Sequence, residues 1–119
     1  MGPKGAGDLT EVVRFERRRA ETDGYGNTQG AWEVLIPRRS ASLKPTRGGD
    51  QVIAARAQGV VPHDLWVSFD SETRAVTTDD RVVDVNDSRR TFKILAIPGD
   101  MDGRRDWLLM QLELGRSDG

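Results

Sequence analysis

Apolar and polar residues alternate most clearly in two runs near the end of the chain, 89–97 and 106–114. The segment between them, 98–105, is rich in Gly, Pro and Asp, a composition that marks a turn. Two alternating runs joined by a turn predict a β-hairpin. With a period of two, one face of each strand points into the core. The residues predicted to point inward are Leu108, Met110, Leu112 and Leu114, together with Phe92, Ile94 and Ala96.

Two shorter alternating runs near the start of the chain predict further strands. The first lies within 9–20, where Val13, Phe15 and Arg17 would share one face, and a glycine-rich turn follows at 23–27. The second is 32–36, with Trp32, Val34 and Ile36 on its buried face. Pro37 lacks a backbone N–H, so it marks an edge or a bulge, and 41–44 resumes the strand beyond it.

The middle of the chain predicts two more strands, 65–70 and 81–85, with turns at 77–80 and 86–88. Leu65, Val67 and Phe69 would face inward. The fold class is therefore all-β. The spacing predicts a small antiparallel β-barrel or sandwich of five to seven strands.

One long loop, 46–64, interrupts this pattern. Asp50 is a plausible N-cap for a short helix at 51–58, which Gly59 would end. Loops of this length inside a compact domain are usually functional or disordered. His63, the only histidine, follows Pro62 and is predicted to be a solvated loop residue.

Composition narrows the function classes. The 119 residues predict one domain, with a barrel over 9–115 between flexible tails at 1–8 and 116–119. Lys and Arg number 18 and Asp and Glu 19, so net charge gives no sign of nucleic-acid attraction. The chain has no cysteine, which excludes a disulfide scaffold. No apolar run approaches the length of a membrane span, and the N-terminus lacks the apolar core of a signal peptide.

Candidate catalytic and metal residues are few. Asp100, Asp102 and Asp106 match a calcium loop poorly and are predicted to form a polar turn. A metal-dependent hydrolase using Asp79, Asp80, Asp100 and Asp102 remains an alternative. No nucleophile elbow, phosphate loop or zinc spacing occurs. The prediction is a binding or assembly module that is not an enzyme and needs no cofactor or metal.

Arginine pairs and tryptophans are the candidate interface residues. Basic clusters occur at 17–19, 38–39, 89–90 and 104–105, and they are predicted to be solvated strand ends and inter-subunit ion pairs. Trp66 and Trp107 lie on the strand faces opposite to the inward sets. They mark either an interface or a second face covered by the helical excursion, and the sequence leaves both interpretations open.

The order of these features resembles that of the bacteriophage head–tail joining proteins, also called head-closure or stopper proteins. The similarity covers roughly 9–115. Each motif is weak evidence alone, and the similarity rests on the order and spacing of the motifs. The motifs are the strand 12–16, the turn Asp23-Gly24-Tyr25-Gly26 with Trp32, the run 41–45, the excursion 49–57, the strand 65–69, the segments 77–83 and 91–97, and Asp102-Gly103-Arg104-Arg105 before the last strand.

The resemblance implies a β-barrel subunit that forms a homo-oligomeric ring in the neck of a tailed phage or phage-like particle, a gene transfer agent among the possibilities. Its partners would be other copies of itself, the portal and adaptor above, tail proteins below, and packaged double-stranded DNA without sequence specificity, but no membrane. It would be in the bacterial cytoplasm during assembly and in the virion neck afterwards. An adaptor or a tail terminator is an alternative within this class, and an OB-like barrel that binds single-stranded nucleic acid is one outside it.

In some members of that family the long loop constricts the channel and retains DNA, which maps here onto 46–64. The channel-loop candidates are Arg47, Gly48, Gly49, Asp50, Gln51, Arg56 and Gly59. The interface candidates are Trp66, Trp107, Arg38, Arg39, Arg104 and Arg105.

Overall fold

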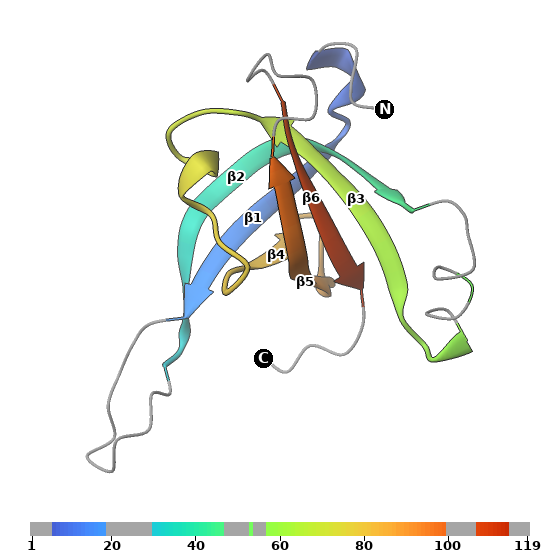
Figure 1. Cartoon of the computed structure of the whole chain (residues 1–119). Coiled ribbons are helices and arrows are strands. Elements are labelled where there is room, and N and C mark those ends of the chain that lie inside the picture. The colour runs from blue at the N-terminus through green and yellow to red at the C-terminus, as the bar shows by residue number, and fades with distance from the viewer. Residues whose placement is uncertain (1–5, 19–29, 47–52, 54–56, 100–106, 115–119) are drawn as a thin grey trace.

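The computed structural model describes residues 6–18, 30–46, 53, 57–99 and 107–114 (Figure 1). The strands are β1 (Glu11–Arg18), β2 (Trp32–Pro45), β3 (Val61–Ser68), β4 (Arg81–Asp84), β5 (Asp87–Gly99) and β6 (Trp107–Leu114). Two short 3-10 turns accompany them, η1 (Ala6–Asp8) and η2 (Thr73–Ala75). No helix in the described part of the chain is long and apolar enough to cross a membrane.

The strands form a closed antiparallel barrel in the order β1-β2-β3-β6-β5-β4, and β4 pairs with β1 to complete it. Closure gives every strand a neighbour on each side, which limits the sites where other chains could add strands, although residues 32–40 of β2 pair with β1 alone. The predicted all-β fold is confirmed, and the strand number lies within the predicted five to seven.

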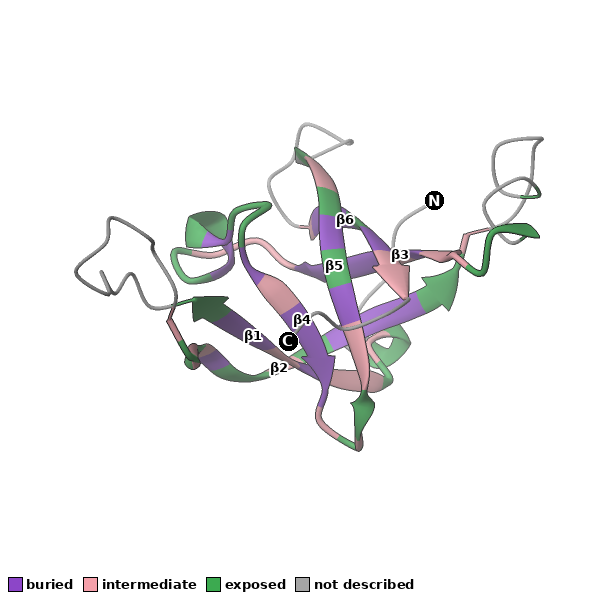
Figure 2. Cartoon of the chain, turned by 90° about the horizontal axis from the view of Figure 1, so that it is seen from below, coloured by how far each residue is buried: buried purple, intermediate pink, exposed green. Residues whose placement is uncertain are grey.

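The core fills the inside of the barrel. Buried positions alternate with less buried ones along β6 and in the middle of β5, whereas three consecutive residues are buried on β2 (41–43), β3 (65–67) and β4 (82–84) (Figure 2). Every strand contributes at least one inward residue, so the core is built from the whole length of the chain. The largest fully buried side chains include Phe15, Phe92, Leu65, Ile94, Met110 and Leu112.

The predicted β5–β6 hairpin is confirmed, and Leu112 pairs with Ile94. The inward face of β6 is as predicted. On β5 the register shifts beyond Ile94, because β5 carries extra residues relative to β6. As a result Ile97 packs against the core, and the prediction that Ala96 faces inward is wrong.

Strand β2 is continuous through Pro37, and of the predicted edge or bulge at this position the structure has a bulge. Val13 pairs with Arg39 and Phe15 with Ile36, so two residues on β1 span three on β2. A second register shift follows toward the start of β2. As a result, the first residues of β2 point to the opposite face of the sheet from the one that simple alternation predicts. Ile36 is buried, but Val34 is 53% exposed, which makes its predicted place in the core wrong.

The connection from β2 to β3 is shorter than predicted. β3 begins at Val61, so His63 and Asp64 belong to a strand. His63 is 3% exposed, not solvated as predicted, and its ring packs edge-on against Phe92 with centroids 5.1 Å apart. The prediction that His63 lies in a loop was wrong because it relied on Pro62, and proline is typical of turns and loops.

Part of the predicted helix at 51–58 falls on described residues. Ile53 and Ala57 have helical backbone, and Gly59 follows in a turn with φ of +82°. This left-handed conformation is the one that favours glycine at a helix end, as predicted. The other residues of the predicted helix lie outside the described residues.

Candidate functional site

Three arginines and one glutamate form a cluster on the outside of the barrel. Residues 14, 16 and 18 alternate with the buried residues of β1, and Arg81 on β4 pairs with Glu16 across the sheet. The Nε atoms of Arg14 and Arg81 donate to the two carboxylate oxygens of Glu16, each at 2.8 Å. Glu16 is only 7% exposed, so these charge-assisted hydrogen bonds hold a shielded carboxylate.

Trp32 extends this cluster. Arg18 and Arg81 lie over its ring, with guanidinium carbons 4.8 and 4.2 Å from the ring centroid, in cation–π contacts. The ring therefore lies beside arginines on the outer face, and the prediction that Trp32 lies in the core is wrong. The shifts in β2 register that expose Val34 have the same effect on Trp32. The Nε1 atom is shielded from solvent and has no hydrogen-bond partner in the structure.

This outer surface is called the arginine wall below. It consists of Arg14, Glu16, Arg18, Trp32, Val34 and Arg81. Arg18 and Val34 are exposed, whereas Arg14 and Arg81 keep 32% and 19% of their side chains exposed. Cationic and aromatic side chains that combine in this way are enriched where proteins bind proteins. The wall is the strongest candidate site on the described surface.

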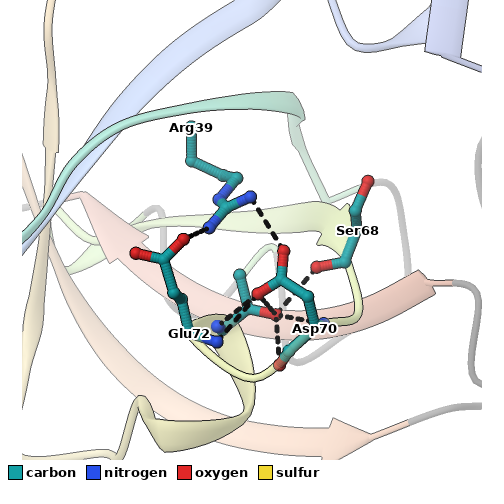
Figure 3. A network of polar contacts seen from close by, with 5 residues as sticks. Arg39, Ser68, Asp70 and Glu72 are labelled. Carbon is teal, nitrogen blue, oxygen red and sulfur yellow. Dashed lines mark hydrogen bonds and ion pairs between the residues drawn. The ribbon is translucent and has the colours of Figure 1, made fainter.

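A second polar network ties the β3–β4 connection to β2 (Figure 3). Arg39 donates from Nη1 to Asp70 Oδ2 and from Nη2 to Glu72 Oε1, both at 2.8 Å. Asp70 Oδ1 also accepts the backbone N–H groups of Glu72 and Thr73. Arg39, an interface candidate, thus has two partners within its own chain. The buried Nε of Arg39 has no partner.

The Asp70 network should weaken in acid. The backbone N–H of Thr73, and after it the Arg39 guanidinium, lower the pKa of Asp70 from its ordinary value of 3.8. A carboxyl whose pKa is lowered by folding stabilises the fold above its unfolded pKa, and this contribution is lost as pH falls through the folded pKa. Near neutral pH, Asp70→Asn should therefore unfold at a lower urea concentration than the native chain. When the pH falls below 4, the free energy of unfolding of Asp70→Asn should decrease less than that of the native chain. Asp79→Asn is the matched control. An unchanged pH profile for Asp70→Asn would contradict the role of the network.

A shallow hollow beside β1 is lined by Arg17, Arg18, Ala75, Thr77, Asp79 and Asp80. Arg17 donates to both carboxylate oxygens of Asp80, at 2.9 and 3.0 Å, and to the carbonyl oxygen of Ala75. The side chain of Asp80 is fully buried, and its hydrogen bond to Arg17 raises the pKa of Arg17. Because Asp80 already binds a guanidinium and the backbone N–H of Thr77, its carboxylate is occupied.

This occupancy argues against the metal-dependent hydrolase alternative. Among the described residues no group of three or more His, Cys, Asp or Glu side chains is placed to hold a metal. Asp79 is exposed in the turn that precedes β4. Asp100, Asp102 and Asp106, and with them the predicted polar turn, lie outside the described residues.

Hydrogen bonds hold together the two ends of the predicted channel loop. Thr46 donates its backbone N–H to the carbonyl oxygen of Pro62 at 2.9 Å and its hydroxyl to Asp64 at 3.0 Å. The two ends of the loop therefore start side by side. Gly59 is exposed. The remaining candidates, Arg47, Gly48, Gly49, Asp50, Gln51 and Arg56, lie outside the described residues.

The interface candidates do not form one surface. Arg38 is exposed beside Pro37, and Arg39 is held by Asp70 and Glu72. Trp66 is 9% exposed and Trp107 is half-buried, both on the outward face of β3 and β6. The low exposure of Trp66 agrees with a covered second face. Arg104 and Arg105 lie outside the described residues.

The arginine wall was missed at the sequence level, although part of its pattern was visible. The alternation of Arg14, Glu16 and Arg18 places three charges on one strand face, opposite to Val13 and Phe15. Arg81 is 65 residues away from Glu16, and only the β1–β4 pairing brings the two together.

Comparison with known proteins identifies the family. The model of the phage head completion protein family matches residues 5–115. The chain belongs to this family. The predicted resemblance is therefore confirmed, and the chain is a structural protein of the phage head–tail region. No curated protein matches the sequence.

Solved structures share the fold of this head completion protein. A chain in the virion of a native gene transfer agent particle superposes with a TM-score of 0.66 at 18% identity, over 90% of this chain and 94% of that one. The solution structure of a protein from Shigella flexneri 2a superposes with a TM-score of 0.64 at 17% identity, over 93% and 96% of the two chains.

Proposed function

We propose that this head completion protein forms a ring in the neck of a tailed phage or gene transfer agent, between the portal or adaptor and the tail. Its barrel, 9–115, serves as the ring subunit and has no catalytic role. Portal or adaptor proteins contact the ring above and tail proteins contact it below. The observation that carries the proposal is the family match over the whole barrel, and the fold shared with a gene transfer agent virion protein supports it.

We further propose that the loop between β2 and β3, 46–60, narrows the channel and retains packaged DNA. The hydrogen bonds of Thr46 to Pro62 and Asp64 fix the base of the loop to the barrel. The placement of each barrel in the ring therefore determines where the base of its loop lies. Retention is steric in this proposal. The chain has 18 basic and 19 acidic residues, and weak phosphate binding suits a plug that must later release DNA.

Deletion of the gene tests the neck role. Particles from the deletion strain should be filled or emptied heads without tails when viewed by electron microscopy, and a plasmid copy of the gene should restore tailed particles. Complete tailed particles in the deletion strain would contradict an essential neck role. That result would favour the alternative hypothesis, in which the barrel binds single-stranded nucleic acid.

A further inference from the structure

We infer that Pro37 keeps free copies of this chain from pairing with one another along an open edge of the barrel. The open edge is residues 32–40 of β2, which pair with β1 but not with β3. Among the strands that the structure describes, it is the longest stretch with a partner on one side only. Pairing of this kind concerns chains outside the particle, and it is separate from the proposed neck role.

The open edge presents backbone groups that the barrel does not use. In an antiparallel pair, alternate residues direct both their N–H and their C=O away from the partner strand. At one end of the edge, Arg39 holds Asp70 and Glu72, so side chains of the β3–β4 connection flank it there. Over 32–38, by contrast, no described loop residue makes a backbone hydrogen bond to the edge. An extended strand in this state is a template to which another strand adds.

A second copy of the chain is the partner that this template invites. Every copy carries the same open edge, and a two-fold axis sets the edges of two copies antiparallel to each other. Val34, on the open edge, is 53% exposed, and valine is a residue that favours strands. An edge with an exposed apolar residue therefore needs a feature that prevents such pairing while the chain is free.

Pro37 supplies this feature near the middle of the open edge. It has no N–H, so it cannot donate to a ladder on either side. The bulge lies at the same place, where two residues on β1 span three on β2, and a bulge bends and twists the strand that carries it. Together they divide the edge into 32–36 and 38–40, which are short for a ladder between chains. Arg38, exposed beside the proline, adds a charge that an incoming strand would meet.

Replacing the proline tests its role, because Pro37→Val restores the N–H and introduces a side chain typical of strands. Sedimentation velocity of the purified chain should show a larger share of dimers and larger species for Pro37→Val than for the native chain, and the difference should grow with protein concentration. In the associated variant, amide hydrogen exchange within 32–40 should slow, since an added strand takes up the free N–H groups.

The matched control is Pro62→Val on β3, which makes the same chemical change in a strand with a neighbour on both sides. Pro62 pairs with Glu113 of β6, and its carbonyl oxygen accepts the backbone N–H of Thr46. No open edge lies there, so the sedimentation of Pro62→Val should match that of the native chain.

A rescue variant separates strand addition from a structural effect of the proline. Val34→Lys combined with Pro37→Val should return the mass to that of the native chain. A lysine on an edge strand opposes the addition of another strand, and it does so without restoring the proline. Association that persists in the double variant would contradict pairing along this edge.

Native mass for Pro37→Val at every concentration would overturn this role of Pro37. A changed urea midpoint in that variant would then assign the proline to the bulge alone. Association without slower exchange within 32–40 would overturn it as well, because the contact would lie elsewhere. If circular dichroism shows that Pro37→Val does not fold, Pro37→Ala restores the N–H with a smaller side chain and carries the same expectations. None of these results bears on the neck role, which the gene deletion tests.

Discussion

Deleting residues 48–59 should leave particles that carry tails but have lost most of their DNA. The deletion keeps the barrel and the loop base, where Thr46 bonds to Pro62 and Asp64, so ring assembly should continue. What disappears is the segment proposed to narrow the channel. Electron microscopy measures the share of filled heads, and nuclease sensitivity measures escaped DNA. Full heads in the deletion variant would contradict retention by this loop.

A matched control separates steric retention from electrostatic retention. Arg47→Ala and Arg56→Ala together remove two positive charges but preserve loop length. If the plug is steric, this variant should retain DNA like the native chain. If phosphate contacts hold the DNA, the variant should leak almost as much as the deletion.

Phe92→Ala should destabilise the barrel by about 3–5 kcal/mol, since it removes a large buried side chain and leaves a cavity. Phe92 is fully buried on β5, packs against the His63 ring, and has the Arg90 guanidinium 5.4 Å from its ring centroid. Urea unfolding followed by tryptophan fluorescence measures the change.

The control for Phe92→Ala is Leu95→Ala on the same strand. Leu95 is 48% exposed, so its truncation should change the free energy of unfolding by about 0.5 kcal/mol or less. Equal losses in the two variants would mean that β5 is not oriented with Phe92 inward.

Alternation of residue types was enough to predict most of the barrel. It placed Leu65, Val67 and the inward residues of β6 correctly, because regular strands keep a period of two. The missing N–H of Pro37 also predicted an edge or a bulge there, and the structure has a bulge.

The errors occur where the register shifts. A bulge turns the following residues to the other face, and nothing in the alternation of β5 reveals its extra residues. Val34, Trp32 and Ala96 were assigned to the wrong side for this reason. His63 was misplaced for another reason, because its burial depends on Phe92, 29 residues later.

The candidate site was harder to predict than the fold. Long-range partners such as Arg39 with Asp70, or Arg81 with Glu16, follow from strand pairing and not from local sequence. The family resemblance led correctly to a virion protein, whereas the arginine wall became visible only when the pairing of β1 with β4 brought Arg81 beside Glu16.

Cryo-electron microscopy of the particle neck tests the central proposal most directly. A reconstruction should contain a ring of six-stranded barrels between the portal or adaptor and the tail, with the loop of each barrel pointing into the channel. A neck without these barrels, or barrels found elsewhere on the capsid, would contradict the assignment to head closure.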